Sequence, residues 1–162
     1  MIIGLARVDD RLIHGQVATV WTKESNASRI IVISDDVAND NLRSTLLKQA
    51  APPGVTASVV GIDKAIRVFH NPKYAKDRVM LLFTTPMDVE RVVDAGIAIE
   101  TLNIGGISYK EGNIQLNKSI FVSKEDARSL RRLAERGIKL DSRGVVNDPN
   151  QNLIELLKKN NM

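Results

Sequence analysis

The stretch MIIGLARVDDRLIHGQVATVWTK, residues 1–23, decides the fold class. Residues 1–8 are apolar and rich in β-branched side chains, as expected of a buried strand, and residues 15–23 have a helical period. Polar and titratable residues, among them Asp9 and His14, lie between the two. The segment therefore predicts a strand, a polar loop and a helix in succession, which is the first unit of an α/β protein.

The same alternation continues along the chain. Further strands are predicted at residues 30–34, 55–60, 79–83 and 101–105, and further helices at residues 39–51, 63–69, 87–95, 124–136 and 152–159. Residues 105–121 interrupt this alternation of strands and helices. They predict a two-stranded excursion, that is, a pair of strands inserted into the alternating pattern, which turns at residues 111–113. Right-handed crossovers between such strands place helices on both faces of the sheet. We expect a three-layer α/β/α open sandwich with a mainly parallel central sheet, forming a single domain over residues 1–162.

Prolines and glycines support these boundaries. The Pro-Pro-Gly triplet at residues 52–54 should end one helix, and Gly96 and Gly137 lie where two others should stop. Thr85 followed by Pro86 is typical of an N-cap with proline at the first helical position.

Composition excludes several classes of protein. The chain is 43% hydrophobic and 26% charged, as in ordinary globular proteins. No apolar run approaches the roughly 20 residues that a membrane-spanning helix needs, and the first residues show neither a basic leader nor a cleavage site. We therefore expect a cytoplasmic location. Because there is no cysteine and only two histidines, far apart, we predict no metal site.

The charge is mildly basic but mixed. Net charge is +4, yet the 23 lysines and arginines are interleaved with 19 acidic residues, and aromatic residues are only 4% of the chain. A nucleic-acid-binding protein would need a concentrated basic stripe or stacking aromatics. We therefore expect no nucleic-acid partner, whereas an acidic protein could dock on a mildly basic face.

The polar residues at the outlet of the first strand form the best candidate site. Open α/β sheets bind ligands outside the carboxyl ends of their strands. A helix that opens at Gly15 and Gln16 would offer free backbone amides and its positive dipole end to whatever His14 carries. We therefore expect the ligand of this site to be an anion.

The residue types in this stretch suit phosphoryl transfer. The neutral imidazole of His14 is nucleophilic near neutral pH, and Arg11 offers a permanently charged planar fork to phosphate oxygens. Asp9 or Asp10 could hydrogen-bond the other ring nitrogen or hold Arg11, and at least one of them should be paired or point away, because two free carboxylates would repel a phosphoryl group. The sequence does not choose between them.

Taken alone, these residues leave alternatives open. His14 is as compatible with a structural role as with a catalytic one. His70 precedes Asn71-Pro72 and is better explained as a capping or surface residue. Trp21 is better explained as core.

Two other strand ends could line the same crevice. Thr84 and Thr85 offer hydroxyls and a second helix N-terminus, and Gly105 with Gly106 permits close backbone approach, but these residues could equally serve only as a cap and a turn. The two aspartates Asp35 and Asp36 could suggest a magnesium site, but the sequence offers no third ligand beside them.

The segment ARVDDRLIHGQVATVW, residues 6–21, resembles the IIB component of the mannose/fructose/sorbose family of the bacterial sugar phosphotransferase system. The resemblance covers essentially the whole chain. It continues, in the family's order, through IIVISDDVANDNLRSTLLKQAAPPGV, VFHNPKY, LLFTTPMDVERVVDAGI, TLNIGGI and IQLNKSIFVSKEDARSLRRLAERGIKLDSR.

The resemblance implies a phosphotransferase that works without nucleotide, metal or other cofactor. His14 would carry the phosphoryl group on its pros nitrogen, Nδ1, and Arg11 would be the arginine of the family signature. A phosphorylated IIA component would load the carrier, which would discharge to a sugar of the sorbose, fructose or mannose class at the membrane IIC and IID components, where it would associate peripherally. Residues 50–54 and 69–72 look most like sorbose and fructose carriers and less like mannose carriers.

The alternative hypothesis is a noncatalytic regulatory module that binds an anion or a nucleotide in the same crevice. For the carrier, which must fit two proteins in turn, we expect a shallow basic rim around His14, formed by Arg7, Arg11 and Lys23, that steers acidic or phosphate-bearing partners.

Overall fold

The computed structural model describes all residues, 1–162, and is built on one six-stranded sheet. The strand order is β3-β2-β4-β1-β5-β8, and every neighbouring pair is parallel. The strands are β1 (Ile2–Asp9), β2 (Arg29–Ile33), β3 (Thr56–Val60), β4 (Arg78–Phe83), β5 (Thr101–Gly106) and β8 (Lys139–Asp141). The predicted parallel sheet is confirmed.

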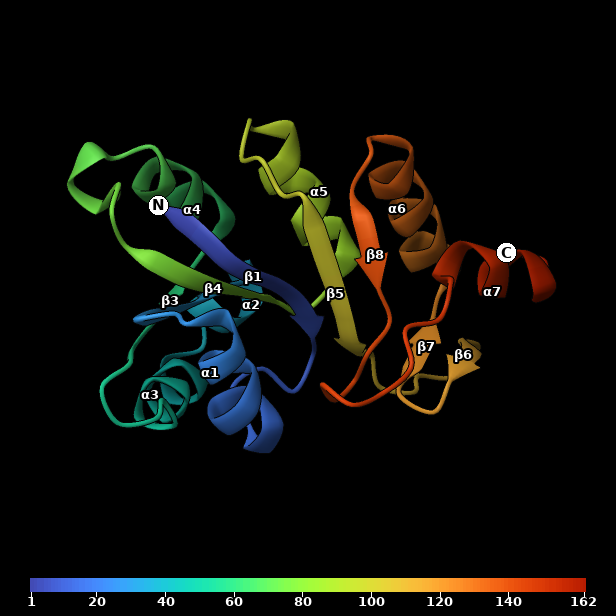
Figure 1. Cartoon of the computed structure of the whole chain (residues 1–162), viewed down its shortest axis with the longest axis horizontal. Coiled ribbons are helices and arrows are strands. Elements are labelled where there is room, and N and C mark those ends of the chain that lie inside the picture. The colour runs from blue at the N-terminus through green and yellow to red at the C-terminus, as the bar shows by residue number, and fades with distance from the viewer.

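Helices cover both faces of this sheet. In Figure 1, α4, α5 and α6 lie above the sheet, whereas α1 and α3 lie below it. The helices are α1 (Thr22–Ser25), α2 (Asp35–Ala38), α3 (Asn41–Gln49), α4 (Ile62–Phe69), α5 (Pro86–Asp94), α6 (Lys124–Glu135) and α7 (Leu153–Lys159), with a 3-10 turn, η2 (Pro72–Tyr74). The three-layer arrangement is as expected. None of these helices combines the length and apolar character needed to cross a bilayer.

Each face of the sheet has its own apolar cluster, of 26 buried residues on the side of α5 and α6 and of 11 on the side of α1. Successive strand residues point to opposite faces. Val8 belongs to the larger cluster, so its neighbours in β1, Arg7 and Asp9, point toward α1. The first strand thereby delivers two charged side chains to one interior face.

The predicted excursion after β5 exists, but its turn lies elsewhere. Strands β6 (Ile114–Asn117) and β7 (Ile120–Val122) form an antiparallel pair joined through residues 118–119. The prediction that the hairpin turns at residues 111–113 is therefore wrong. The Asn117 side chain accepts hydrogen bonds from the amides of Ser119 and Ile120 and thereby stabilises the tighter turn. Gly112, with a φ of +83°, serves a separate turn before β6.

The predicted caps are confirmed. Thr85 is the N-cap of α5 and accepts a hydrogen bond from the Asp88 amide, with Pro86 at the first helical position. Gly96 and Gly137 follow helix ends with φ of +90° and +86°, a conformation that glycine adopts without strain.

Candidate active site

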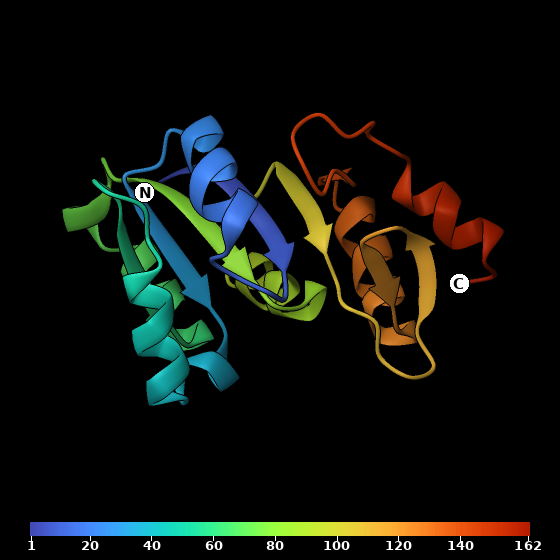
Figure 2. The same ribbon diagram turned by 90° about the horizontal axis from the view of Figure 1, so that it is seen from below.

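The carboxyl ends of the strands share one edge, and the candidate site lies there. Figure 2 shows the arrowheads of β2, β4, β1 and β5 together at this edge. The chain leaving β1 passes to the face of α1, whereas the chain leaving β5 passes to the face of α6, so these neighbours flank a switch point of the kind where open α/β sheets bind ligands. A cavity of about 670 Å³ opens here, lined by His14, Arg11, Gly15 and Gln16 among eleven mainly polar residues.

A strained turn brings His14 back beside the end of β1. The Leu12 amide donates to the Asp9 carbonyl at 2.9 Å, and Leu12 has a φ of +62°, which costs a leucine about 1–2 kcal/mol. Burial of Leu12 and Ile13 in the cluster beneath α1 offsets that strain. The helix begins at Gly15, since the Ala18 amide donates to the His14 carbonyl, and His14 stands at its N-terminus.

The first helix contains a π-helical turn, η1 (Val17–Trp21), before it continues as α1. The Thr22 amide and hydroxyl both reach the Val17 carbonyl, five residues back. Such turns are rare and often lie at functional sites. Here the turn is followed by Trp21 donating from Nε1 to the Gly144 carbonyl at 3.1 Å, which ties the helix to the loop after β8.

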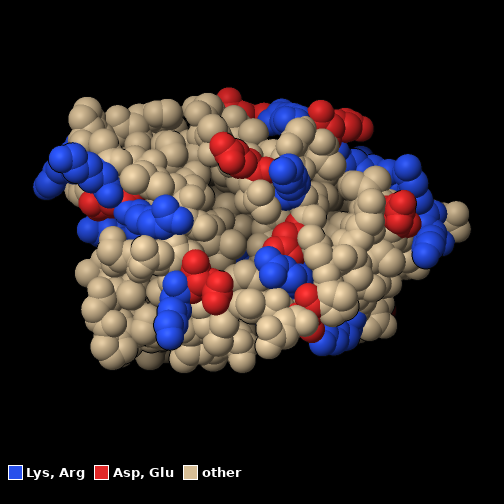
Figure 3. All heavy atoms as spheres, viewed as in Figure 1, with Lys and Arg blue, Asp and Glu red and all other residues tan.

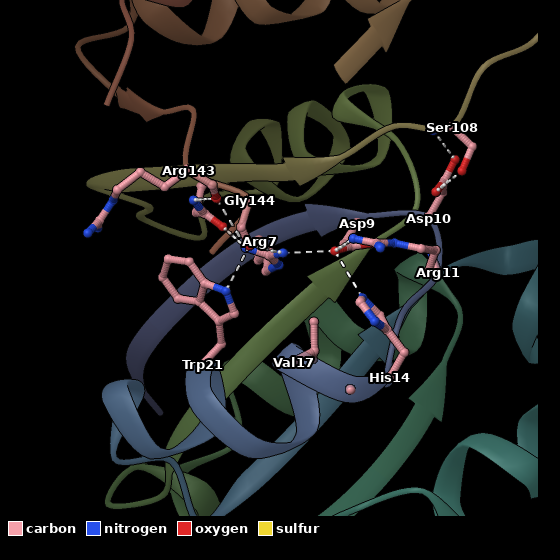
Figure 4. Close-up of polar contacts among 12 residues, drawn as sticks. Arg7, Asp9, Asp10, Arg11, His14, Val17, Trp21, Ser108, Arg143 and Gly144 are labelled. Atoms are coloured by element: carbon pink, nitrogen blue, oxygen red, sulfur yellow. Dashed lines mark hydrogen bonds and ion pairs between the residues drawn. The ribbon is translucent and has the colours of Figure 1, made fainter. Parts of the chain in front are cut away.

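Asp9 is the centre of the site. Its carboxylate accepts hydrogen bonds from Arg7 Nη2 at 2.8 Å, from Arg11 Nε and Nη2 at 3.1 Å each, and it lies 3.2 Å from His14 Nε2. Figure 4 shows it between Arg7 and His14. The Asp9 side chain is fully buried, whereas His14 is 26% exposed and Arg11 53% exposed. The network thus runs from the interior to the cavity.

The ionised carboxylate of Asp9 decides which ring nitrogen of His14 carries the proton. Burial alone would raise the pKa of Asp9, but the hydrogen bonds from Arg11, the charge of Arg7 and the contact with His14 together hold it below its usual value. An ionised carboxylate only accepts hydrogen bonds, so His14 Nε2 must carry a proton. The lone pair of the neutral ring is then on Nδ1, which has no hydrogen-bond partner in the chain.

Arg7 is a buried positioning residue and not part of a surface rim. Its side chain is fully buried, donates to Asn103 Oδ1 and the Gly144 carbonyl, and lies 4.8 Å from the centre of the Trp21 ring. Burial lowers its pKa, which the neighbouring Asp9 opposes. The expectation that Arg7 belongs to an exposed rim is therefore wrong, because the alternation of β1 directs it inward.

Gly105 makes room for this arginine. A Cβ at Gly105 would lie 1.9 Å from the guanidinium carbon of Arg7, so no other residue fits while Arg7 keeps its place. The close approach expected of the glycine pair is present, and the group that approaches is a side chain of the protein.

The structure distinguishes the two aspartates. Asp10 accepts hydrogen bonds from the amide and hydroxyl of Ser108, both at 2.8 Å, and Figure 4 shows it pointing away from His14. The expectation that one carboxylate is paired elsewhere is confirmed, and the one beside His14 is Asp9.

Other candidates lie outside the cavity. Neither Thr84 nor Thr85 lines it, and the Thr85 hydroxyl is used as the cap of α5, so their role in binding phosphate stays a prediction without geometric support. Lys23 does not line it either. His70 is the exposed C-cap of α4, as expected. Asp35 accepts hydrogen bonds from the Ile62 amide and Arg91.

Sequence reasoning missed the inner support of the site: Arg7 as a buried partner of Asp9, Asn103, Trp21 as an anchor, and the loop around Gly144. One signal was present. Arg7 and Asp9 alternate within a strand that is otherwise apolar, and such a pair on one interior face requires partners nearby.

Fold and site together define an open α/β protein whose histidine, held by an aspartate, faces a mainly polar cavity at the switch point. Residues 3–162 match the family model described as PTS system sorbose subfamily IIB component. The chain belongs to this family, and the resemblance read from its sequence is confirmed.

Individual relatives agree with the assignment. The chain is 56% identical over 159 residues to the "PTS system mannose-specific EIIAB component" of Escherichia coli (strain K12), covering 98% of this chain and 49% of that protein. It thus spans about half the length of that relative. It is 52% identical to the "PTS system sorbose-specific EIIB component" of Lacticaseibacillus casei, covering 95% of this chain and 94% of that protein. The crystal structure of the IIBSor domain of the sorbose permease from Klebsiella pneumoniae superposes with a TM-score of 0.95 at 50% identity, covering 98% of both chains.

These identities do not rank sorbose and fructose carriers above mannose carriers. The mannose-specific relative is 56% identical, the sorbose-specific one 52%, and a fructose-specific EIIB component of Bacillus subtilis (strain 168) 40%, over 98% of this chain and 97% of that protein. The likeness of residues 50–54 and 69–72 to sorbose and fructose carriers stays a prediction, because whole-chain identity does not test single motifs.

Proposed function

We propose that this chain is a phosphoryl carrier that accepts the group on His14 Nδ1 from a phosphorylated IIA domain and passes it to a sugar of the sorbose, fructose or mannose class at a membrane permease of IIC and IID components. The observation that carries the proposal is the state of the His14 ring. Nε2 is held by ionised Asp9, and Nδ1, which bears the lone pair, is free in a ring that lines the cavity. Family membership supports the same role.

In the loading step, the Nδ1 lone pair attacks phosphorus while the bond from phosphorus to the donor's histidine nitrogen breaks, and that nitrogen keeps the electron pair. Nε2 keeps its proton, and Asp9 stabilises the positive charge that the ring gains during attack. In the discharge step, a sugar hydroxyl oxygen attacks phosphorus, the bond to Nδ1 breaks, and the hydroxyl proton is released. The phosphoryl group passes in line through a loose, charge-spread transition state.

The groups around His14 suit the transferred anion. Arg11 uses Nε and Nη2 on Asp9, which leaves Nη1 for phosphoryl oxygens. Gly15 and Gln16 line the cavity at the helix N-terminus, and their amides have no acceptor within the chain. Backbone amides and a helix dipole at this position stabilise negative charge without moving.

A labelled transfer assay tests the proposal. The chain is incubated with the IIA part of the mannose-specific EIIAB relative, phosphorylated with labelled phosphate. The expected product is a labelled chain whose phosphate is labile in acid and stable in base, as a phosphohistidine is. Absence of label, with an anion binding in the cavity, would favour the noncatalytic regulatory module instead.

Arg11→Lys is expected to slow transfer to sugar roughly ten- to hundredfold, because loss of one charge-assisted hydrogen bond in the transition state costs about 1.5–3 kcal/mol. Binding to the IIA donor should change less. Single-turnover transfer and titration calorimetry measure the two effects separately. Arg43→Lys is the matched control, since Arg43 is exposed and does not line the cavity. Equal transfer rates in both variants would show that Arg11 does not bind the phosphoryl group.

Docking to the IIA donor is expected to weaken as salt rises. Arg11 and Lys118 are the exposed cations that line the cavity, and exposed charge pairs are screened beyond about 10 Å at 0.1 M salt. On the face shown in Figure 3, basic and acidic groups are interspersed, so steering must come from a local cluster and not from a broad basic stripe. Chemical-shift mapping at low and high salt should show residues 9–16 shifting, with lower affinity at high salt. A salt-independent affinity would contradict this model.

A further inference from the structure

The turn of the β6–β7 hairpin and the loop after β8 meet at the cavity of His14. The cavity lining includes Lys118 and Ser119 from the turn and Gly144, Val145 and Asp148 from the loop. The turn is fixed in place, since Ile107 at the end of β5 donates to the Ser119 carbonyl and accepts from the Phe121 amide. Lys118 is therefore anchored through its backbone beside the cavity, while its side chain is 76% exposed.

Lys118 pairs with Asp148 across the edge of the cavity. The Lys118 Nζ lies 3.0 Å from Asp148 Oδ1. The other oxygen of Asp148 accepts the amides of Gly144 and Val145. The amide of Val145 and the Lys118 side chain lower the pKa of Asp148, so the carboxylate is ionised. Because two backbone amides hold Asp148 in the loop, it does not depend on Lys118 for its position.

We propose that Lys118 is a second phosphoryl-binding residue, which leaves Asp148 and contacts the phosphoryl group once His14 is loaded. This inference rests on the proposed function. Among the residues lining the cavity, Asp148 is the single acidic one and Arg11 and Lys118 are the permanently charged cations.

Lys118 should bind the phosphoryl group more strongly than it binds Asp148. An exposed lysine–carboxylate pair contributes little to stability, so breaking it costs little. A phosphoryl group adds about −1.5 to −2 charges and three strong acceptor oxygens to the same cavity. Asp9 already occupies two nitrogens of Arg11, so the dianion needs a further cation. Lysine suits this role because its ammonium is a compact charge on a long flexible stem.

The test is a phosphorus NMR titration of the chain loaded by the phosphorylated IIA domain. A neighbouring cation favours the dianionic phosphoryl group and lowers its second pKa. Lys118→Gln should raise that pKa by roughly half a unit or more, while Lys118→Arg keeps it near the wild-type value. The matched control is Lys110→Gln, which removes the same charge from an exposed residue of the same excursion that does not line the cavity.

The equilibrium of phosphoryl exchange with IIA gives a second readout. The comparison is made at a pH above the second phosphoryl pKa of both the wild-type chain and the variant. There, a rise of half a unit in that pKa should shift the exchange equilibrium about threefold toward phosphorylated IIA in Lys118→Gln and not in Lys110→Gln. If the wild-type and both glutamine variants titrate alike, or if Lys110→Gln shifts as much as Lys118→Gln, the inference is overturned while the carrier function stands. Failure of the wild-type chain to take up phosphate would overturn the proposed function and the inference with it.

Discussion

His14→Ala is expected to abolish phosphoryl acceptance while leaving the fold intact. The ring supplies the nucleophilic nitrogen, and no other residue of the cavity lining offers a comparable nucleophile with its partner in place. The side chain is 26% exposed, its hydrogen-bond partner is Asp9, and it belongs to neither apolar cluster, so its loss should leave the core intact. Labelled transfer from phosphorylated IIA should fall to background, and circular dichroism and the thermal midpoint should stay near wild type.

The matched control is His70→Ala, which removes the other histidine from the exposed end of α4. It should load normally. Full loading of the His14 variant together with loss of loading in the His70 variant would place the acceptor on His70 and refute the proposed site.

Asp9→Asn is expected to impair both stability and transfer. The substitution leaves the Arg7 guanidinium charged and fully buried without its counterion, and removing one partner of a buried pair costs about 3–5 kcal/mol. It also allows the amide to face His14 as a donor, which would favour the tautomer with the proton on Nδ1. By analogy with aspartates that orient catalytic histidines, transfer should fall by roughly a thousandfold or more. Urea unfolding and single-turnover transfer measure the two effects.

Asp10→Asn is the control, since its carboxylate bonds exposed Ser108, and the change in unfolding free energy should stay within about 1 kcal/mol. The pH dependence gives a further check. Because the folded-state pKa of Asp9 is depressed, its contribution is present at neutral pH and is lost as pH falls through that folded pKa. The stability gap between wild type and Asp9→Asn should therefore shrink in acid; a gap that is constant with pH would contradict the ionised network.

The five strands predicted from the sequence are present because each carries an apolar or β-branched run that packs into a sheet covered on both faces, a pattern that local sequence records directly. The three-residue edge strand β8 and the four-residue α2 escaped prediction, since their hydrogen bonds depend on neighbours distant in sequence. The hairpin turn was misplaced because Gly112 is the stronger local turn signal, whereas the Asn117 side chain decides the actual turn.

At the site, His14 and Arg11 were identified from a contiguous signature, and the structure places both at one cavity. The choice of Asp9 over Asp10 could not be made, because it depends on the exact end of β1 and on Ser108, nearly a hundred residues away. The burial of Arg7 depends equally on remote residues, namely the missing Cβ of Gly105 and the carbonyl of Gly144. Contacts between residues so far apart in the chain produce only a weak signal in the local sequence.

The Arg7–Asp9–Arg11 trio has a consequence for the order of events in the proposed cycle. With a neutral ring on His14, the trio leaves the unloaded site with one net positive charge. A phosphoryl group brings about −1.5 to −2 charges, while the ring, whose Nε2 keeps its proton, gains one positive charge, so the loaded site is close to neutral. The net positive charge of the unloaded site would draw an anionic donor toward the empty carrier, and the loss of this charge would weaken the hold on the donor once the group has moved. The same surface could then release one partner and meet the next without any change of backbone shape.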